Sequence, residues 1–163
     1  MNKQLMVKPE KCVGCKSCEV VCAYTREKNF EPANSAVSVQ IFEEACICVP
    51  VMCMQCEDAG CVNICPVKAM KRADDGSIKC DTAKCIGCKM CVSACPMGNV
   101  DFNTMTRKII KCELCGGKPN CVKYCPVDAI VYTDEADGLG RKQAMAAALK
   151  NIFGADSKAS SGL

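Results

Sequence analysis

Sixteen of the nineteen cysteines in this 163-residue chain fall into four groups with closely similar spacing. The groups are Cys12-x2-Cys15-x2-Cys18-x3-Cys22, Cys53-x2-Cys56-x4-Cys61-x3-Cys65, Cys85-x2-Cys88-x2-Cys91-x3-Cys95 and Cys112-x2-Cys115-x5-Cys121-x3-Cys125. We call them motifs one to four. Proline follows the last cysteine of motifs two, three and four, as Pro66, Pro96 and Pro126. The pattern is an internal repeat of one cysteine motif, with a longer middle spacing in the second and fourth copies.

The residues that usually build a hydrophobic core are scarce. Hydrophobic residues make up 50% of the chain, but 19 of them are cysteine, aromatic residues are only 4%, and tryptophan is absent. We therefore expect bound metal to stabilise the fold. Histidine is also absent, which excludes Cys/His zinc fingers, Rieske centres and c-type haem attachment. Without histidine, hydrolytic or nucleophilic catalysis by this chain is not expected.

Three uses of so many cysteines compete: disulfides, zinc sites and iron–sulfur clusters. Residues 1–10 show no apolar stretch, cleavage site or twin-arginine pair of the kind that directs export. The longest apolar run, Ala45 to Met54, is too short to span a bilayer and contains Pro50. We therefore expect a cytoplasmic protein with reduced thiols, which disfavours a disulfide framework.

The spacing within the motifs favours cubane clusters over zinc. A C-x2-C-x2-C loop can wrap three iron corners of a 4Fe–4S cluster, and the fourth corner takes a cysteine from elsewhere in the chain. A zinc site instead pairs two C-x2-C knuckles around one tetrahedral ion. Motifs one and three each place three cysteines within seven residues, and the Cys-Pro ends have no role in a zinc ribbon. Zinc remains the alternative.

Bound clusters would reverse the sign of the net charge. A 4Fe–4S core with four thiolates contributes about −2, so four of them change the formal charge of +3 to about −5. This argues against a nucleic-acid partner. Lysines beside the cysteines either offset part of the cluster charge or are ordinary solvated residues, namely Lys16, Lys84, Lys89, Lys111 and Lys123.

Three cysteines, Cys46, Cys48 and Cys80, stand outside the motifs. We expect them to be small buried apolar side chains, with a redox or metal role as the alternative.

Short strands and turns are predicted between the motifs. Residues 67–72 and 77–81 flank Asp75-Gly76 as a hairpin, and 100–103 and 107–111 form a second pair. Residues 37–42 and 129–133 are further short strands. The x3 gap before each last cysteine suits one helical turn. Near the end of the chain, residues 141–153 show an apolar face at helical spacing, formed by Met145, Ala148, Leu149, Ile152 and Phe153.

The sixteen-cysteine spacing resembles the four-cluster ferredoxin-like subunits of bacterial and archaeal redox complexes. These subunits serve molybdenum and tungsten oxidoreductases, formate hydrogenlyase and carbon monoxide dehydrogenase. The resemblance covers roughly residues 4–132, and it is close in the segment 49–58 and the following Cys61. Some relatives have tryptophan as the third ligand of motif three and hold a 3Fe–4S centre. Here that residue is Cys91, so the resemblance implies four 4Fe–4S clusters.

By that resemblance motif one pairs with four, and motif two with three, and each cluster takes its last ligand from the partner motif. The implied ligand sets are Cys12, Cys15, Cys18 and Cys125; Cys112, Cys115, Cys121 and Cys22; Cys53, Cys56, Cys61 and Cys95; and Cys85, Cys88, Cys91 and Cys65.

The expected fold class is α+β, with two bacterial-ferredoxin-like halves, each binding two clusters, one inserted in the other. Short strands, one-turn helices and a C-terminal amphipathic helix complete it. The expected ranges are 1–22 and 99–133 for the first half, 53–98 for the second, 23–52 for a loop-rich insertion, 138–154 for the C-terminal helix and 155–163 for a disordered tail.

The expected function is electron relay between a catalytic oxidoreductase subunit and a second redox subunit or carrier, with no catalytic residue of its own. Because the chain is short, the compact subunits beside tungsten aldehyde oxidoreductases or carbon monoxide dehydrogenase are favoured, with a weak preference for the former. The alternative is a free polyferredoxin serving carbon monoxide dehydrogenase, hydrogenase or formate dehydrogenase. The C-terminal helix either docks on a partner, including another copy of the chain, or packs on its own domain. No membrane insertion is expected.

Overall fold

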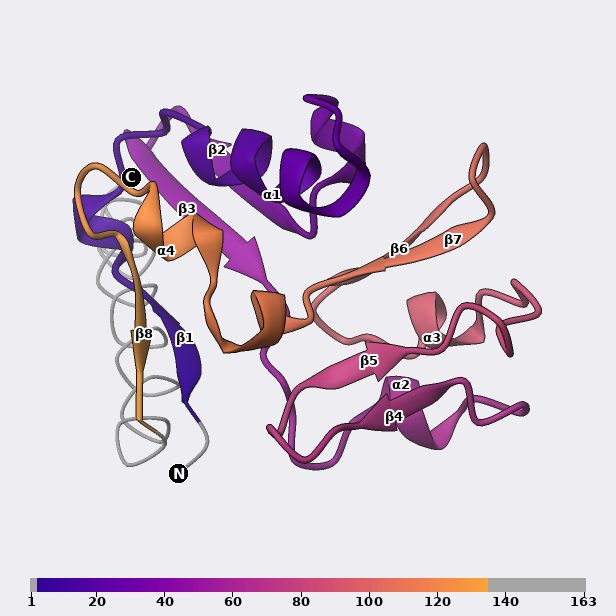
Figure 1. The fold of residues 1–163 in the computed structure, drawn as a ribbon. Coiled ribbons are helices and arrows are strands. Elements are labelled where there is room, and N and C mark those ends of the chain that lie inside the picture. Colours follow the sequence, from indigo (N-terminus) through magenta and orange to yellow (C-terminus); the bar gives the residue numbers. More distant parts are fainter. Residues whose placement is uncertain (1–2, 135–163) are drawn as a thin grey trace, which may run out of the picture.

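The computed structural model describes residues 3–134 as a small mixed fold of short strands and short helices (Figure 1). Within these residues the strands are β1 (Gln4–Val7), β2 (Val37–Phe42), β3 (Ile47–Met52), β4 (Met70–Arg72), β5 (Ile78–Cys80), β6 (Val100–Asn103), β7 (Lys108–Lys111) and β8 (Ile130–Thr133). They form four separate two-stranded antiparallel sheets, β1 with β8, β2 with β3, β4 with β5 and β6 with β7. Two-stranded sheets are marginally stable alone, so their stability depends on what packs between them.

Each α-helix carries the third cysteine of one motif. The helices are α1 (Ser17–Glu27), α2 (Gly60–Asn63), α3 (Met90–Ser93) and α4 (Asn120–Lys123), with 3-10 turns η1 (Pro9–Lys11), η2 (Pro32–Asn34) and η3 (Leu114–Gly117). Helix α1 packs against α4, and α2 packs against α3. Of the helices that the structure describes, none combines the length and apolar character needed to span a bilayer.

The β1–β8 sheet joins the two ends of the described chain. Gln4 pairs with Thr133 and Val7 with Ile130, so the two strands run side by side (Figure 1). The contact continues past the strands, where the Lys8 N–H donates to the Ala129 carbonyl at 2.8 Å. Motif one follows β1 and motif four precedes β8. The sheet therefore brings these two motifs together across more than 100 residues of sequence.

Two groups of buried side chains form the core. The first contains Leu5, Cys18, Cys22, Val37, Val39, Met52, Cys53, Cys112, Leu114, Cys121 and Ile130. The second contains Ala59, Cys61, Met70, Ile78, Cys91, Val100 and Ile109. Cysteines of motifs one and four thus gather in the first group, and cysteines of motifs two and three in the second, apart from Cys53. The β6–β7 hairpin lies beyond the expected boundary at residue 99, yet it contributes Val100 and Ile109 to the second group.

The predicted short strands are confirmed, and so are the one-turn helices of motifs two, three and four, whereas in motif one the helix continues for 11 residues as α1. Strands β2 and β6 have the predicted bounds, and β4, β5, β7 and β8 fall inside the predicted ranges. Two strands were not predicted: β1, and β3 in the segment 23–52 that was expected to be rich in loops. The expected C-terminal helix at 138–154 and tail at 155–163 lie outside the described residues.

Candidate functional site

The four motifs share one backbone feature at their third residue. That residue has a left-handed conformation in every motif, with φ of +68° at Gly14, +49° at Gln55, +69° at Gly87 and +56° at Leu114. Left-handed residues curl the chain sharply and point consecutive N–H groups to the same side, which forms an anion-binding concavity. The loop between the first two cysteines of each motif is therefore shaped to surround a negatively charged group. Only motifs one and three have glycine at this position, where glycine adopts the left-handed conformation at low energetic cost.

A second repeated turn follows the last cysteine of motifs two, three and four. The Sγ atoms of Cys65, Cys95 and Cys125 each accept a hydrogen bond from the N–H four residues later, at 3.2, 3.3 and 3.2 Å. The residue before each donor has positive φ, namely Lys68, Gly98 and Asp128. Motif one lacks the proline and continues as α1, and there Cys22 Sγ accepts from the Ala36 N–H at 3.3 Å. The last cysteine of every motif is thus fixed by a backbone donor.

The structure brings the motif cysteines together in four places, which we name sites A to D. Site A is Cys12, Cys15, Cys18 and Cys125; site B is Cys22, Cys112, Cys115 and Cys121; site C is Cys53, Cys56, Cys61 and Cys95; site D is Cys65, Cys85, Cys88 and Cys91. All four cysteines line one space at sites A, C and D, with volumes of about 300, 380 and 320 Å³ including the part open to solvent. At site B three of them line a wider space, and Cys121 lies near Cys112, Cys22 and Cys115.

Helix geometry explains why each motif serves two sites. Cys18 and Cys22 are four residues apart on α1, on the same face and about one turn apart. Cys18 therefore faces site A, while Cys22 reaches site B. The pairs Cys61/Cys65, Cys91/Cys95 and Cys121/Cys125 have the same spacing, with the first cysteine on α2, α3 or α4 and the second two residues past the end of that helix. Because α1 packs on α4 and α2 on α3, the last cysteine of each motif reaches the loop of its partner motif.

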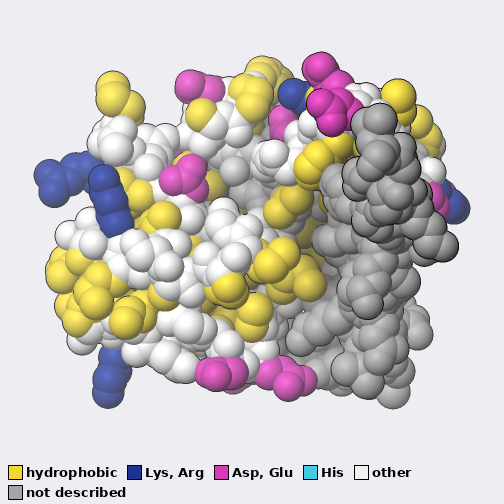
Figure 2. All heavy atoms as spheres, turned by 180° about the vertical axis from the view of Figure 1, so that it is seen from behind, with side chains coloured by type: hydrophobic (Ala, Val, Ile, Leu, Met, Phe, Trp, Pro, Cys, Tyr) yellow, Lys and Arg dark blue, Asp and Glu magenta, His cyan; other side chains and the backbone are white. Residues whose placement is uncertain are grey.

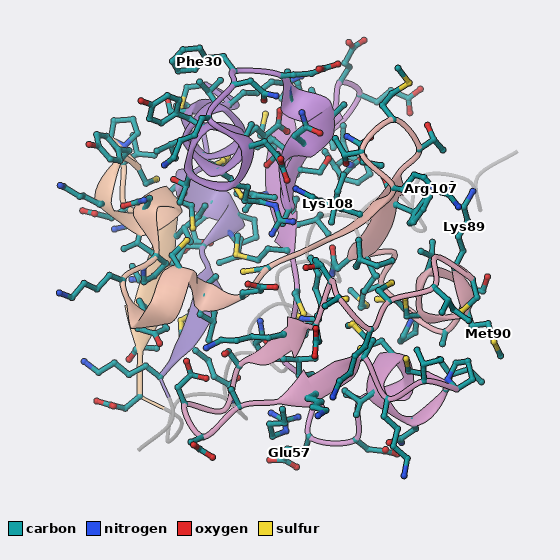
Figure 3. The ribbon with its side chains drawn as sticks, turned by 45° about the vertical axis from the view of Figure 1, so that its right-hand side comes forward. Phe30, Glu57, Lys89, Met90, Arg107 and Lys108 are labelled. Carbon is teal, nitrogen blue, oxygen red and sulfur yellow. The ribbon has the colours of Figure 1, made fainter. Side chains whose placement is uncertain are left out.

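The sites differ in how far they are open to solvent. Cys15, Cys88 and Cys115 are exposed, at sites A, D and B respectively, whereas site C has no exposed cysteine. Lys89 and Met90 project outward from the start of α3 (Figure 3). Viewed from the opposite side to Figure 1, hydrophobic side chains, with cysteine among them, reach the surface in several groups (Figure 2). Charged side chains lie mainly at the margins of that view.

Burial makes several of these thiols hard to ionise without a metal. Burial, together with the nearby Glu19 carboxylate, raises the pKa of Cys18 to about 12. Burial also raises the pKa of Cys112 to about 12, opposed by the Leu114 N–H. Cys15 is the opposite case, because hydrogen bonds from Ser17 lower its pKa. The buried thiols are therefore protonated near neutral pH, and binding of iron must release those protons.

The cysteines outside the motifs have three different environments. Cys46 is exposed, so the expectation that it is buried is wrong, because it lies in the tight turn between β2 and β3. Cys48 is half-buried beside site A, where its charge acts on Cys12. Cys80 is half-buried at the spaces of both site B and site D.

Two buried polar residues near the sites were not identified as such from the sequence. Four of the five lysines beside cysteines are exposed, but Lys111 is 1% exposed. Gln55 is also buried, and its side chain joins the Cys112 carbonyl to the Ile78 N–H. The only signal in the sequence was the position of both residues beside cysteines. Their burial depends on neighbours more than twenty residues away.

The donor chemistry of the four sites fits 4Fe–4S clusters. Every donor is a thiol, four gather at each site, and the chain contains no histidine. Among the described residues, no three histidine, cysteine or acidic side chains converge as ligands of a single ion do. Four separated thiols that line one space suit a cubane core, with its four iron corners, better than one ion. The loops and their thiols define an iron–sulfur protein.

Comparison with known proteins agrees with this class. The 4Fe-4S dicluster domain family matches residues 44–135, and a 4Fe-4S binding domain matches residues 9–25. The YsaA protein of Escherichia coli K12 is 37% identical over 144 residues, covering 82% of this chain and 91% of that one. The thiosulfate reductase electron transfer subunit PhsB of Salmonella typhi is 34% identical over 145 residues, covering 80% of this chain and 76% of that one.

A relative from an archaeon is equally similar. The polyferredoxin-like subunit of the aliphatic sulfonate oxidoreductase of Pyrococcus furiosus is 37% identical over 123 residues, covering 74% of this chain and 70% of that one. The chain belongs to the 4Fe–4S dicluster family of ferredoxin-like electron-transfer proteins.

Proposed function

We propose that the chain relays electrons through four 4Fe–4S clusters held at sites A to D. The order of the sites carries this proposal. Cys18 of site A lies beside Cys121 of site B, and Cys112 of site B lies beside Cys53 of site C. Cys61 of site C in turn lies beside Cys91 of site D. Neighbouring cysteines thus connect site A to B, B to C and C to D, as an electron path requires.

The chain's own residues hold the clusters, shield part of the electron path from solvent and leave other parts of it exposed. Each bound cluster supplies one-electron chemistry, and its potential depends on charge, hydrogen bonds to sulfur and solvent exposure. The exposed Cys15 and Cys88 bring the two terminal sites, A and D, to the surface, where redox partners can approach. Of the two inner sites, site C has no exposed cysteine, whereas Cys115 of site B is exposed. No step requires a catalytic acid or base, so the chain acts as a carrier and not as an enzyme by itself.

The partners we propose are a catalytic oxidoreductase subunit and a second redox subunit or carrier in the cytoplasm. Relatives named as electron-transfer and polyferredoxin-like subunits support the subunit role over a free polyferredoxin. A tungsten aldehyde oxidoreductase is the specific partner we favour. Native anaerobic purification, with analysis of co-purifying chains for tungsten, molybdenum and nickel, tests it. A chain that elutes alone and reduces several unrelated enzymes would support the free carrier instead.

The ligand sets can be tested by paired substitutions. Anaerobically purified protein should contain about sixteen irons and sixteen sulfides per chain, four of each per cubane. Cys125→Ser should alter the spectroscopic signal of the cluster in the motif-one loop, although Cys125 belongs to motif four. Cys22→Ser should alter the cluster in the motif-four loop. Cys46→Ser is the control, because Cys46 is exposed and outside all four sites.

Two outcomes would contradict the proposal. An iron content near eight per chain rules out four cubanes. If Cys125→Ser and Cys115→Ser perturb the same cluster, motif four holds a cluster with its own four cysteines, and the sharing of ligands between motifs is wrong.

A further inference from the structure

Lys111, the last residue of β7, is a lysine enclosed by protein. It is 1% exposed, and its Nζ lies 3.0 Å from Cys53 Sγ and 3.1 Å from the Cys112 carbonyl oxygen. Burying an ammonium group is costly unless a negative or strongly polar partner compensates it. The partner available here is a cysteine sulfur of site C. A cluster bound at that site, with its net negative charge, would complete the compensation.

Lys111 lies at the junction between sites B and C. It directly precedes Cys112 of site B in the chain, it contacts Cys53 of site C, and its charge also reaches Cys61. The surrounding backbone is held firmly. Arg26 Nη1 donates to the Lys111 carbonyl at 2.6 Å, and Gln55 Nε2 donates to the Cys112 carbonyl at 2.9 Å. The ammonium therefore has little freedom to move away from the sulfur.

The other lysines beside cysteines act through solvent. Lys16 and Lys89 follow the second cysteines of motifs one and three, at sites A and D, and both are exposed. Lys89 lies over the Phe102 ring, with Nζ 4.9 Å from the ring centre. Exposed charges are weakened by water and salt, whereas a charge enclosed by protein acts in a low-dielectric medium. Of these three lysines, Lys111 has by far the strongest effect on a cluster.

We propose that Lys111 raises the reduction potential of the site C cluster above the potentials of the terminal clusters at sites A and D, so that an electron on the path settles at its centre. Reduction adds one negative charge to the cluster, and a fixed ammonium hydrogen-bonded to a ligand sulfur stabilises that charge. The step moves one electron between neighbouring clusters, and it breaks no bond and needs no further reactant. This inference rests on the proposed four-cluster relay.

The test is a redox titration of the full-length, cluster-loaded protein, followed by electron paramagnetic resonance. Lys111→Met removes the charge with little change in size. At the wild-type midpoint potential of the site C cluster, Lys111→Met should lower the ratio of reduced to oxidised cluster at least about tenfold. For a one-electron couple, this corresponds to a shift of about 59 mV in the midpoint potential. Lys111→Arg keeps the charge and should recover most of that shift. Lys89→Met is the matched control at an exposed lysine and should leave the site C midpoint unchanged.

A second measurement does not depend on the Lys111 variants loading their clusters. In a wild-type background, Cys56→Ser changes a site C ligand other than Cys53, the one that Lys111 hydrogen-bonds, and Cys88→Ser changes the corresponding ligand of site D. The signal that is reduced first should change in Cys56→Ser and persist in Cys88→Ser. The inference is overturned if the first-reduced cluster belongs to site A or D, or if fully loaded Lys111→Met titrates like the wild type. An iron content near eight would instead refute the four-cluster relay itself.

Discussion

Gln55 is a buried side chain that connects the two halves of the cysteine framework. Its Nε2 donates to the Cys112 carbonyl at 2.9 Å, and its Oε1 accepts from the Ile78 N–H at 2.8 Å. Replacing Gln55 with leucine keeps the size of the side chain but removes both bonds. The Cys112 carbonyl keeps a donor in Lys111 Nζ, whereas the buried Ile78 N–H loses the acceptor that Gln55 provides.

The cost of this change follows from those two groups. An unsatisfied buried N–H costs about 1–3 kcal/mol, and the loss of one hydrogen bond at a carbonyl that keeps another costs about 0.5–1.5 kcal/mol. The leucine side chain recovers part of this by burying apolar surface. We expect a net destabilisation of about 2–3 kcal/mol. At about 1.4 kcal/mol per factor of ten, that corresponds to roughly a 30- to 150-fold larger population of the opened state.

The assay is the rate at which the visible absorbance of the clusters disappears at a fixed guanidinium concentration, with a chelator present. When opening is fast relative to iron capture, this rate follows the population of the opened state. Gln40→Leu is the matched control. Gln40 is exposed on β2, and its side-chain amide donates a hydrogen bond to Ser38 Oγ at 2.9 Å. If Gln55→Leu loses its clusters at the rate of Gln40→Leu, the buried bridge does not stabilise the protein.

Two further predictions concern site A and the cysteine assignment. An ideal Cβ at Gly14 would lie 2.8 Å from Cys48 Sγ with φ at +68°, whereas at Gly98 the φ of +62° is similar but no atom lies within 4 Å. Gly14→Ala and Gly98→Ala therefore share a backbone penalty of about 1–2 kcal/mol. Gly14→Ala should release iron faster than Gly98→Ala, because its methyl group also meets Cys48 Sγ. The double variant Gly14→Ala/Cys48→Ala should release iron at the Gly98→Ala rate. In loaded protein, iodoacetamide should modify the exposed Cys46 first and reach the sixteen motif cysteines only after iron is released. Early modification of Cys15 or Cys88, identified by peptide mass, contradicts their assignment as ligands.

The cysteine motifs could be predicted because their information is local. Spacing alone indicates the tight loops and one-turn helices, and the alternation of residues 37–42 predicts β2. Strand β1 was missed because it is only four residues long and pairs with β8, more than 100 residues away. Strand β3 was missed because it contains Pro50. A two-stranded sheet tolerates this proline, because both of its strands are edges and need not donate from every residue.

The burial of Lys111 could not be predicted for a similar reason. A lysine beside a cysteine is normally solvated, and the contact that encloses Lys111 comes from Cys53, 58 residues earlier. The same limit applies to the left-handed residues Gln55 and Leu114. Their motifs lack the glycine that signals this conformation in motifs one and three, so only the loop geometry reveals it.

The shared helices determine how the sites depend on one another. Sites A and B are linked through motifs one and four, and sites C and D through motifs two and three, because the third cysteine of each motif, on its helix, lies in one site and the fourth lies in the other. The separation within a pair is therefore limited by the four-residue spacing between these two cysteines. Sites B and C share no helix among the described residues. They are joined by the hydrogen bonds of Lys111 to Cys53 and of Gln55 to Cys112, and by the packing of Cys53 in the first buried group. Substitutions at Lys111 and Gln55 should consequently weaken the influence of sites A and B on sites C and D. The coupling between the two sites within each pair should stay intact.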